Sequence, residues 1–599
     1  MSFTVNARKI TLSLLIGSSS LMLFACGSSG SDSSAPAPVA PPAPPPATPP
    51  SSGASDTNEL IKVNQLGFYP ASQKIAIVPD NGATEFSVLN SDGVSVLDGE
   101  LSQANTWDMD GRSVRMADFS ALSTSGTYTI EVDGVSASNP FSISSDVYSD
   151  AHDTVLKAYY FNRASTALDA QYAGDWQRPT AHPDTQVLVH ASAASEQRPE
   201  GFVLSSPKGW YDAGDYNKYI VNSGISTYTL LAAYENYSDF YQTRSLNIPE
   251  SDNALPDIID EILWNLTWMQ TMQDPNDGGV YHKLTTLNFE GAVMPHEATA
   301  QRYVVQKSTS AALNFAAVSA QASRIFSSID SLSALSSELQ SAALSAWQWA
   351  QQNPDVPYIQ PSDVFTGRYD DTNFNDEFSW AAVELFLLTE DTQFLDQYLS
   401  LNVPATTPSW PQVGTLGMLS LLNNGKELLS EAQYANVQDK VLGFANQILA
   451  EQGNAYQVGM TRSDLIWGSN SNGLNKAIVL LHAAQHTSGD AKPYVDAAVN
   501  FVDYVLGRNP TDYSYVTGLG SKPPLDIHHR QSYADNVAAP VPGFVAGGAQ
   551  PGQQDNCSYP SSQPARSYLD DWCSYSTNEI TINWNAPMVY MLAAMESAN

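Results

Sequence analysis

The first part of the chain alternates short apolar and polar runs. Between residues 59 and 144, runs such as 74–78, 86–89 and 128–132 are separated by turns rich in Asn, Ser, Asp and Gly. Alternation of this kind predicts short, half-buried β-strands. Strands of this length and spacing predict a small all-β sandwich of immunoglobulin type. No cysteine pair spans the region, so the similarity is to the architecture and not to antibody domains.

After residue 146 the apolar positions recur at the 3.6-residue spacing of helices. The predicted helices cover residues 155–168, 223–237, 257–273, 309–326, 335–352, 378–388, 431–452, 474–487 and 494–506, and a last one begins near Thr581. The loops between them are long and rich in Gly, Pro, Asn and aromatic residues. The chain is therefore expected to be mainly α, with a helical domain larger than a bundle whose loops carry the site on one rim.

The N-terminus has the layout of an export signal. Arg8 and Lys9 precede an apolar run over residues 10–25, which is shorter than a typical membrane-spanning helix. The run ends in Leu-Phe-Ala-Cys-Gly, which resembles a bacterial lipoprotein signal with Cys26 as the lipid-modified residue. This predicts an outer-membrane or cell-surface lipoprotein held to the membrane only by its lipid. Plain secretion is the alternative.

These patterns divide the chain into four segments. Residues 1–25 are the predicted signal, and residues 26–57, almost entirely Ser, Ala, Pro and Gly, form a stiff tether. The β-sandwich is expected at 58–145 and the helical domain at 146–599. A chain of 599 residues is long enough for at least two domains.

The net charge of -35 narrows the class of ligand. Phosphate contacts require clustered Lys and Arg, so nucleic-acid binding is not expected. Acidic substrates would be repelled, which favours a neutral ligand. The chain contains three cysteines, and if Cys26 is acylated only Cys557 and Cys573 remain. In an exported protein these two either form a disulfide or stay as free thiols.

Two carboxylates, Asp212 and Asp215, lie three residues apart in a turn with Gly214 and flanking aromatics. Sugars bind such places, because their C–H faces stack on aromatic rings while carboxylates take their hydroxyls. Hydrolysis of a glycosidic bond needs one carboxylate as base or nucleophile and one carboxylic acid for the leaving oxygen. Asp215 and the distant Glu579 could fill those roles. The alternative is an ordinary polar turn.

Other polar residues have a chemical and a structural interpretation. His528 and Arg530 lie in a Pro- and Gly-rich loop and offer donors for hydroxyls, although a loop His is more often structural. Glu579 precedes the last helix: burial would raise its pKa, whereas the helix dipole would lower it. His482 and His486 have metal-ligand spacing, but Ala483 replaces the glutamate of an HExxH motif.

Taken together, these motifs resemble family 9 of the glycoside hydrolases, the inverting cellulases with an (α/α)6 barrel. The resemblance is carried by segments 212–215, 467–470, 506–510, 514–530 and 568–586, and segment 63–68 is similar to the immunoglobulin-like module of one branch of that family. It implies an endoglucanase that cleaves β-1,4-glucosidic bonds with inversion. An exo-acting cellodextrinase or β-glucosidase is the enzymatic alternative. A non-catalytic glycan-binding surface lipoprotein is the alternative from another class. We expect a monomer.

The resemblance also implies roles for individual residues. Asp215 would be the general base, Asp212 would help to hold the attacking water, and Glu579 would be the general acid. The remaining predicted residues are His528 and Arg530 around the cleavage point, Asp570 as a further active-site carboxylate that supports the charge and position of the acid, and Trp467, Tyr575 and Tyr216 as subsite walls.

The chemistry so implied needs no cofactor, but family members carry structural metals. The family's zinc site is built from cysteines and histidines. Here Ala164 and Ala181 stand where the cysteines would be, which leaves only His182 and His190 and argues against zinc. Calcium sites are common in the family, and the loop 274–279 offers oxygen ligands, although it is equally a plain turn.

Overall fold

The structure is a computed structural model, and it describes residues 59–598. The predicted signal, Cys26 and the tether lie outside the described residues. Within these residues, no helix is long and apolar enough to cross a membrane.

The N-terminal region is the predicted β-sandwich. Its strands are β1 (Gly67–Phe68), β2 (Ile75–Pro79), β3 (Glu85–Asn90), β4 (Ser95–Glu100), β5 (Asn105–Thr106), β6 (Ser113–Asp118), β7 (Gly126–Glu131) and β8 (Phe141–Ile143). One sheet has the order β1-β8-β7-β3-β4 and the other β2-β6-β5. The alternation in β7 buries Tyr128 and Ile130, which pack with Val88 and Phe141 between the sheets. The predicted immunoglobulin-type architecture is confirmed.

The rest of the chain is mainly helical. Its helices are α1 (Ser149–Phe161), α2 (Ala170–Ala173), α3 (Ile220–Asn236), α4 (Ser238–Tyr241), α5 (Asp257–Thr271), α6 (Thr309–Phe326), α7 (Ser333–Gln352), α8 (Asn375–Thr389), α9 (Thr392–Leu401), α10 (Gly414–Asn424), α11 (Glu431–Ala450), α12 (Ser469–His486), α13 (Lys492–Val505), α14 (Arg530–Ala534), α15 (Tyr575–Asn578) and α16 (Ile582–Ser597). The predicted helices are found within a few residues, except that α1 covers Ser149–Phe161 instead of 155–168. Helices α9 and α10 and the short helices α2, α4, α14 and α15 were not predicted.

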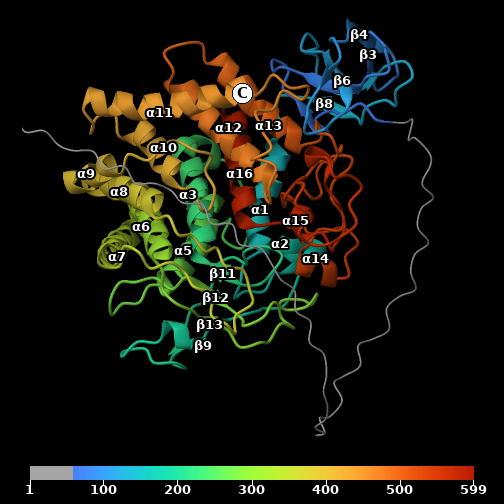
Figure 1. Cartoon of the computed structure of the whole chain (residues 1–599). Coiled ribbons are helices and arrows are strands. Elements are labelled where there is room, and N and C mark those ends of the chain that lie inside the picture. The colour runs from blue at the N-terminus through green and yellow to red at the C-terminus, as the bar shows by residue number, and fades with distance from the viewer. Residues whose placement is uncertain (1–58, 599) are drawn as a thin grey trace, which may run out of the picture. The chain divides into compact units, whose positions relative to one another are not determined.

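The long helices form two concentric layers, as expected of an (α/α)6 barrel. Helices α3, α6, α8, α10, α12 and α16 contact one another in that order and close an inner ring. Each packs against an outer partner: α5 on α3, α7 on α6, α9 on α8, α11 on α10 and α12, α13 on α12, and α1 on α16. Figure 1 shows α3, α12 and α16 near the centre, with α7, α9 and α11 at the periphery.

Sequence decides which layer each helix joins. The inner helix α6 is buried on nearly every side, and apart from Asn314, Gln321 and Arg324 its residues are apolar or small. The outer helix α11 buries only Val437, Val441, Ala445 and Ile448, one stripe at helical spacing. A capping box at Ser430 and Gln433 begins α11 by satisfying orphan backbone groups.

Short strands connect some of the helices and carry residues of the site. They are β9 (Val187–Val189), β10 (Val203–Leu204), β11 (Lys218–Tyr219), β12 (Lys283–Thr285) and β13 (Tyr303–Val304), in the order β10-β9-β13-β12-β11. Strand β11 immediately follows the 212–215 turn and leads into α3, so this sheet fixes the turn at one end of the barrel.

Candidate active site

A cavity of about 840 Å³ collects the predicted residues from distant parts of the chain. It is lined by Asp212, Ala213, Asp215, Tyr219, Phe289, Gly367, Arg368, Tyr369, Ser409, Trp410, Pro411, Ile466, Trp467, Gly468, Ser471, Asn472, His528, Arg530, Tyr575, Glu579, Thr581, Asn583 and Trp584. The predicted Asp212, Asp215, Glu579, His528, Arg530, Trp467 and Tyr575 are therefore brought together. Aromatic walls around a few carboxylates are typical of a sugar-binding site.

Gly214 lets the turn that carries Asp212 and Asp215 pack directly against the segments of His528 and Glu579. A Cβ atom on Gly214 would lie 2.2 Å from the carbonyl oxygen of His528 and 3.2 Å from Oε1 of Glu579. Arg530 adds two hydrogen bonds to the carbonyl of Gly214, from its backbone N–H at 3.2 Å and from Nη1 at 2.7 Å. Only glycine permits this close approach, which places the turn against the segments of His528 and Glu579.

Asp215 presents one carboxylate oxygen to the cavity. Its Oδ2 accepts hydrogen bonds from Nδ2 of Asn217 at 2.5 Å and from the hydroxyl of Tyr219 at 3.1 Å. Among the described residues, none donates to Oδ1. The side chain lines the cavity while being 4% exposed. Two donors fix the plane of the carboxylate, and Oδ1 remains as an oriented acceptor for the proton of a bound water.

The orientation of Asp215 is set from β12 and the segment after it. Thr286 donates its backbone N–H to Oδ1 of Asn217 at 2.9 Å, which turns the amide of Asn217 toward Asp215. Lys283 donates to the carbonyl of Gly367 at 2.5 Å, and the N–H of Gly367 donates to the hydroxyl of Tyr219 at 3.1 Å. Both donors to Oδ2 are thus held by neighbours that do not touch the carboxylate themselves.

Asp212 has both carboxylate oxygens occupied. Nδ2 of Asn222 donates to Oδ1 at 2.7 Å, and the hydroxyl of Tyr369 donates to Oδ2 at 2.7 Å. Burial, followed by the negative charge of Asp215, raises the pKa of Asp212 above its usual range. The raised pKa favours the protonated form of Asp212, so Asp212 is less suited than Asp215 to take a proton from water. Each of its oxygens can still accept a further hydrogen bond, and its role in holding the water stays a prediction.

The surroundings of Glu579 favour its protonated form. Burial raises its pKa to about 8, and the charge of Asp215 acts in the same direction, against the guanidinium of Arg530 and a hydrogen bond from Gly214. The net shift of the Glu579 pKa has the upward direction that the sequence analysis expected from burial. The carboxyl group keeps its proton at neutral pH and faces the cavity that Asp215 also lines. This is the protonation state required to protonate a leaving oxygen.

His528 is held neutral and in one tautomer. Burial lowers its pKa, and its Nδ1–H donates to the carbonyl of Trp572 at 2.7 Å. Nε2 is then left unprotonated and can accept a substrate hydroxyl. Arg530 uses its Nε to bind the carbonyl of Glu290 at 2.9 Å and lies over the ring of Phe289, so it fixes loops around the cavity as well as lining it.

Two predicted residues lie outside the cavity. Tyr216 is 1% exposed, donates its hydroxyl to the carbonyl of Val293 at 2.6 Å and packs on Tyr211 and His182. The prediction that Tyr216 forms a subsite wall is wrong, because its ring is buried against Tyr211 and His182 and does not line the cavity.

Asp570 also does not reach the reacting atoms. It accepts hydrogen bonds from the backbone of Leu525 at 2.9 Å and Asp526 at 3.0 Å, and from Nδ2 of Asn578 at 3.0 Å. These contacts fit the predicted role of Asp570 in supporting the position of the acid, because they tie the loop before His528 to the residue before Glu579.

The structure adds residues that sequence reasoning missed. Asn217 and Tyr219 follow Asp215 by two and four residues, so their proximity could have been found from the local sequence. Tyr369, Trp410 and Trp584 reach the cavity from separate loops and the last helix, and no local pattern marks them.

Cysteine and histidine pairs have structural roles. Cys557 and Cys573 form a disulfide with a Cα–Cα distance of 6.2 Å. His482 is 2% exposed and bonds the hydroxyl of Tyr590 at 3.1 Å, whereas His486 bonds the hydroxyl of Tyr434 at 3.2 Å. Within the described residues, both histidines therefore make hydrogen bonds with tyrosine hydroxyls of the helical domain.

The two histidines that remain of the family's zinc site make hydrogen bonds with protein groups, and the absence of zinc stays a prediction. His182 bonds the hydroxyl of Tyr211 at 2.7 Å and the carbonyl of Ala298 at 2.9 Å. His190 bonds Ser192 at 2.9 Å and Asp363 at 3.2 Å. Both ring nitrogens of each histidine are engaged in protein hydrogen bonds.

The loop 274–279 is a poor cation site, because a lysine already neutralises it. Nζ of Lys307 lies 2.7 Å from Oδ2 of Asp274 and 2.8 Å from Oδ1 of Asp277. Arg198 adds a second positive charge 3.4 Å from Oδ1 of Asp274. The carboxylates named by the sequence are therefore satisfied without a metal.

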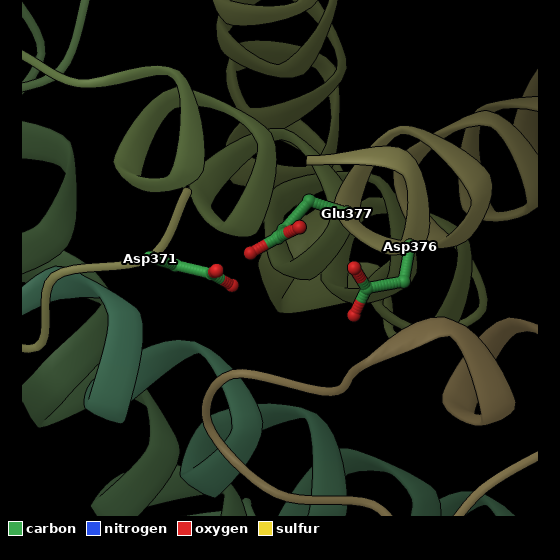
Figure 2. A group of neighbouring side chains, drawn as sticks. All are labelled: Asp371, Asp376 and Glu377. Carbon is green, nitrogen blue, oxygen red and sulfur yellow. The ribbon is translucent and has the colours of Figure 1, made fainter. Parts of the chain in front are cut away.

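A different acidic cluster, which sequence reasoning missed, could hold a metal ion. Asp371, Asp376 and Glu377 each bring a carboxylate oxygen within 4.8 Å of the others. Figure 2 shows Asp371 on a loop facing Asp376 and Glu377 at the start of α8. Glu377 is fully buried, and among the described residues no N–H or hydroxyl group donates to either of its oxygens or to Oδ2 of Asp371, so these oxygens face the other carboxyl groups of the cluster. Oxygen ligands of this kind suit a hard divalent cation.

Comparisons with known proteins agree with this geometry. The profile of glycosyl hydrolase family 9 matches residues 148–592, and that of the cellulase N-terminal ig-like domain matches residues 56–137. A xyloglucan-specific endo-β-1,4-glucanase of Bacteroides ovatus is 41% identical over 560 residues, covering 90% of this chain and 94% of the relative. Endoglucanase D of Acetivibrio thermocellus is 33% identical and covers 90% of this chain and 84% of its own. A solved family 9 structure from Bacteroides ovatus has a TM-score of 0.84 at 40% identity, covering 90% of this chain and 99% of that chain.

Proposed function

The chain belongs to glycosyl hydrolase family 9, and we propose that it is an endo-β-1,4-glucanase that hydrolyses its substrate with inversion. One observation carries the proposal: Asp215, with an unoccupied and oriented Oδ1, shares a cavity with Glu579, whose raised pKa keeps it protonated. A base and an acid in one aromatic-walled cavity are the two groups that inverting hydrolysis requires. Their presence also favours an enzyme over a glycan-binding protein without chemistry.

The proposed reaction is a single displacement. Oδ1 of Asp215 takes a proton from water as the water oxygen attacks the anomeric carbon. The bond from that carbon to the glycosidic oxygen breaks, and Glu579 gives its proton to the leaving oxygen. Asp212 fixes the turn that carries the base, with its own oxygens bound by Asn222 and Tyr369. The two carboxyl groups supply both proton transfers, and the mechanism uses no cofactor.

We propose a neutral β-1,4-glucan, and xyloglucan in particular, as the substrate. The net charge of -35 disfavours acidic polysaccharides, and the Bacteroides ovatus relative is named for xyloglucan specificity. The test compares initial rates and product lengths on xyloglucan, carboxymethyl cellulose and cellohexaose. Rapid loss of viscosity on xyloglucan is expected. Hydrolysis of cellohexaose alone, with stepwise release of one sugar, would instead show an exo-acting cellodextrinase.

We further propose that the cluster of Asp371, Asp376 and Glu377 binds a structural calcium ion. Burial and the two neighbouring carboxyl groups raise the pKa of Glu377 well above its usual range. Without a cation, the buried and neighbouring carboxyl groups therefore destabilise the fold, and a divalent cation would offset their repulsion. Calcium at a hundred times its Kd is expected to stabilise the fold by about 2.7 kcal/mol. Thermal unfolding with EDTA and with added calcium measures this.

Two variants make that test specific. Asp376→Asn with Glu377→Gln should abolish the calcium-dependent shift in Tm. Asp274→Asn, in the loop whose carboxylates are already paired with Lys307, should keep it. Calcium dependence that survives loss of the cluster, or is lost with Asp274, would overturn the assignment.

For localisation, we propose that the protein is anchored to a membrane by lipid on Cys26. The proposal rests on the charged residues and apolar run before Cys26. Cys26→Ala is expected to move the protein from the membrane fraction to the soluble fraction without changing its activity on soluble substrate. A wild-type protein found free in the periplasm or medium would contradict the anchor.

A further inference from the structure

A stack of aromatic rings leads out of the cavity to the surface. His528 lines the cavity. The ring of Trp572 lies on it with centroids 4.4 Å apart and planes 24° from parallel, and Tyr533 lies on Trp572 at 4.4 Å and 33°. Trp572 and Tyr533 are not part of the cavity lining. We call Trp572 and Tyr533 the outer aromatic pair.

The pair continues a line of rings that starts inside the cavity. Trp467 packs on Tyr575 with centroids 5.5 Å apart, and Tyr575 meets His528 edge-on at 5.7 Å. The line thus runs from Trp467 through His528 to Tyr533, which is 59% exposed. Tyr533 therefore carries the line of rings from the binding cavity to the surface, where an aromatic ring can take part in recognition.

The outer aromatic pair is held rigidly. The carbonyl of Trp572 accepts the Nδ1–H of His528, and the next residue, Cys573, is joined to Cys557 by the disulfide. Tyr533 lies on α14, and its N–H donates to the carbonyl of His529 at 3.1 Å. A fixed aromatic surface binds with little loss of conformational entropy.

We propose that the exposed side of Tyr533, supported from behind by Trp572, forms a second binding site for the same glucan chain, outside the cavity, which takes sugar units remote from the bond that is cleaved. Sugar C–H faces stack on aromatic rings, and the nearby exposed carboxylates of Asp526 and Asp571 can accept hydroxyls. Continuity with the cavity selects a long, neutral polysaccharide as the occupant. This inference rests on the proposed function.

The test is the ratio of kcat/KM on polymeric xyloglucan to kcat/KM on cellotetraose. Tyr533→Ala is expected to lower this ratio about 3- to 10-fold, mainly through KM on the polymer, because one stacking surface is lost. Trp572→Ala should lower it in the same direction. Phe202→Ala removes a ring that is 41% exposed but belongs to neither the cavity nor the stack, and it should leave the ratio unchanged.

The disulfide provides a second measurement. The double variant Cys557→Ser, Cys573→Ser keeps every aromatic ring but releases the segment that carries Trp572, so the ratio should fall as in Trp572→Ala. Tyr533→Ala with an unchanged ratio, on an enzyme that does hydrolyse both substrates, would overturn the second site. A wild-type enzyme that hydrolyses neither substrate would instead overturn the proposed function.

Discussion

Asp215→Ala is expected to lower kcat on a β-1,4-glucan by about 10²- to 10⁴-fold, the usual cost of losing a general base. The loss should be partly rescued by azide. Azide is a small nucleophile that needs no deprotonation and can attack from the side where Asp215 directs water. The rescued product is the glycosyl azide, which can be detected directly by mass spectrometry.

The same anion should not rescue Glu579→Ala on a substrate with a poor leaving group, because the missing function there is a proton. Asp570→Asn is the matched control, because Asp570 accepts hydrogen bonds from the backbone of Asp526 and from Asn578 and does not line the cavity. It should lower activity without any azide response. Equal rescue of the Asp215 and Glu579 variants would mean that base and acid are wrongly placed.

Glu579→Gln is expected to abolish hydrolysis of natural glycosidic bonds while stabilising the fold at neutral pH. The folded-state pKa is about 8 against 4.5 for the free side chain. Between these values the unfolded chain releases a proton that the folded chain keeps, so this carboxyl makes the wild type less stable as the pH rises. Glutamine does not titrate, so Glu579→Gln removes this pH-dependent loss of folding stability.

The measurement is the difference in Tm between Glu579→Gln and wild type at pH 5 and at pH 8. The difference should grow with pH, by the equivalent of about 1–3 kcal/mol, a range reduced because the carboxyl is partly open to water in the cavity. Wild-type kcat/KM should also fall above pH 8, as Glu579 loses its proton. A variant that is less stable than wild type at pH 8 would contradict the burial of this acid.

The fold was largely predictable because both domains follow simple periodicities. Period-two alternation marked β2, β3 and β7, and period 3.6 marked most barrel helices. Helix α10 was missed because its sequence, Gly-Thr-Leu-Gly-Met, contains two glycines that lower helix propensity. Packing in the inner ring overrides that propensity. Helix α1 ends early because the chain must turn at Asn162 to bring Trp210 alongside it through the bridge from Arg163.

The site was predictable where chemistry is concentrated in short motifs and not where it depends on tertiary contacts. The sequence placed Asp215, Glu579, His528 and Arg530 correctly in one cavity. It could not show that Asp570 faces backbone amides, because that depends on where the 525–528 loop lies. The acidic cluster at the start of α8 was likewise hidden, since Asp376 and Glu377 look like ordinary first-turn carboxylates.

The central claim is that Asp215 and Glu579 act as base and acid on opposite sides of one glycosidic bond, with a water molecule between the base and the anomeric carbon. Inverting enzymes separate the two carboxyl groups by about 6.5–9.5 Å to admit that water. Proton NMR of the reaction on cellohexaose or xyloglucan oligosaccharide, recorded before mutarotation, tests this directly. The account predicts the α-anomer as the first product, and an initial β-anomer would contradict it.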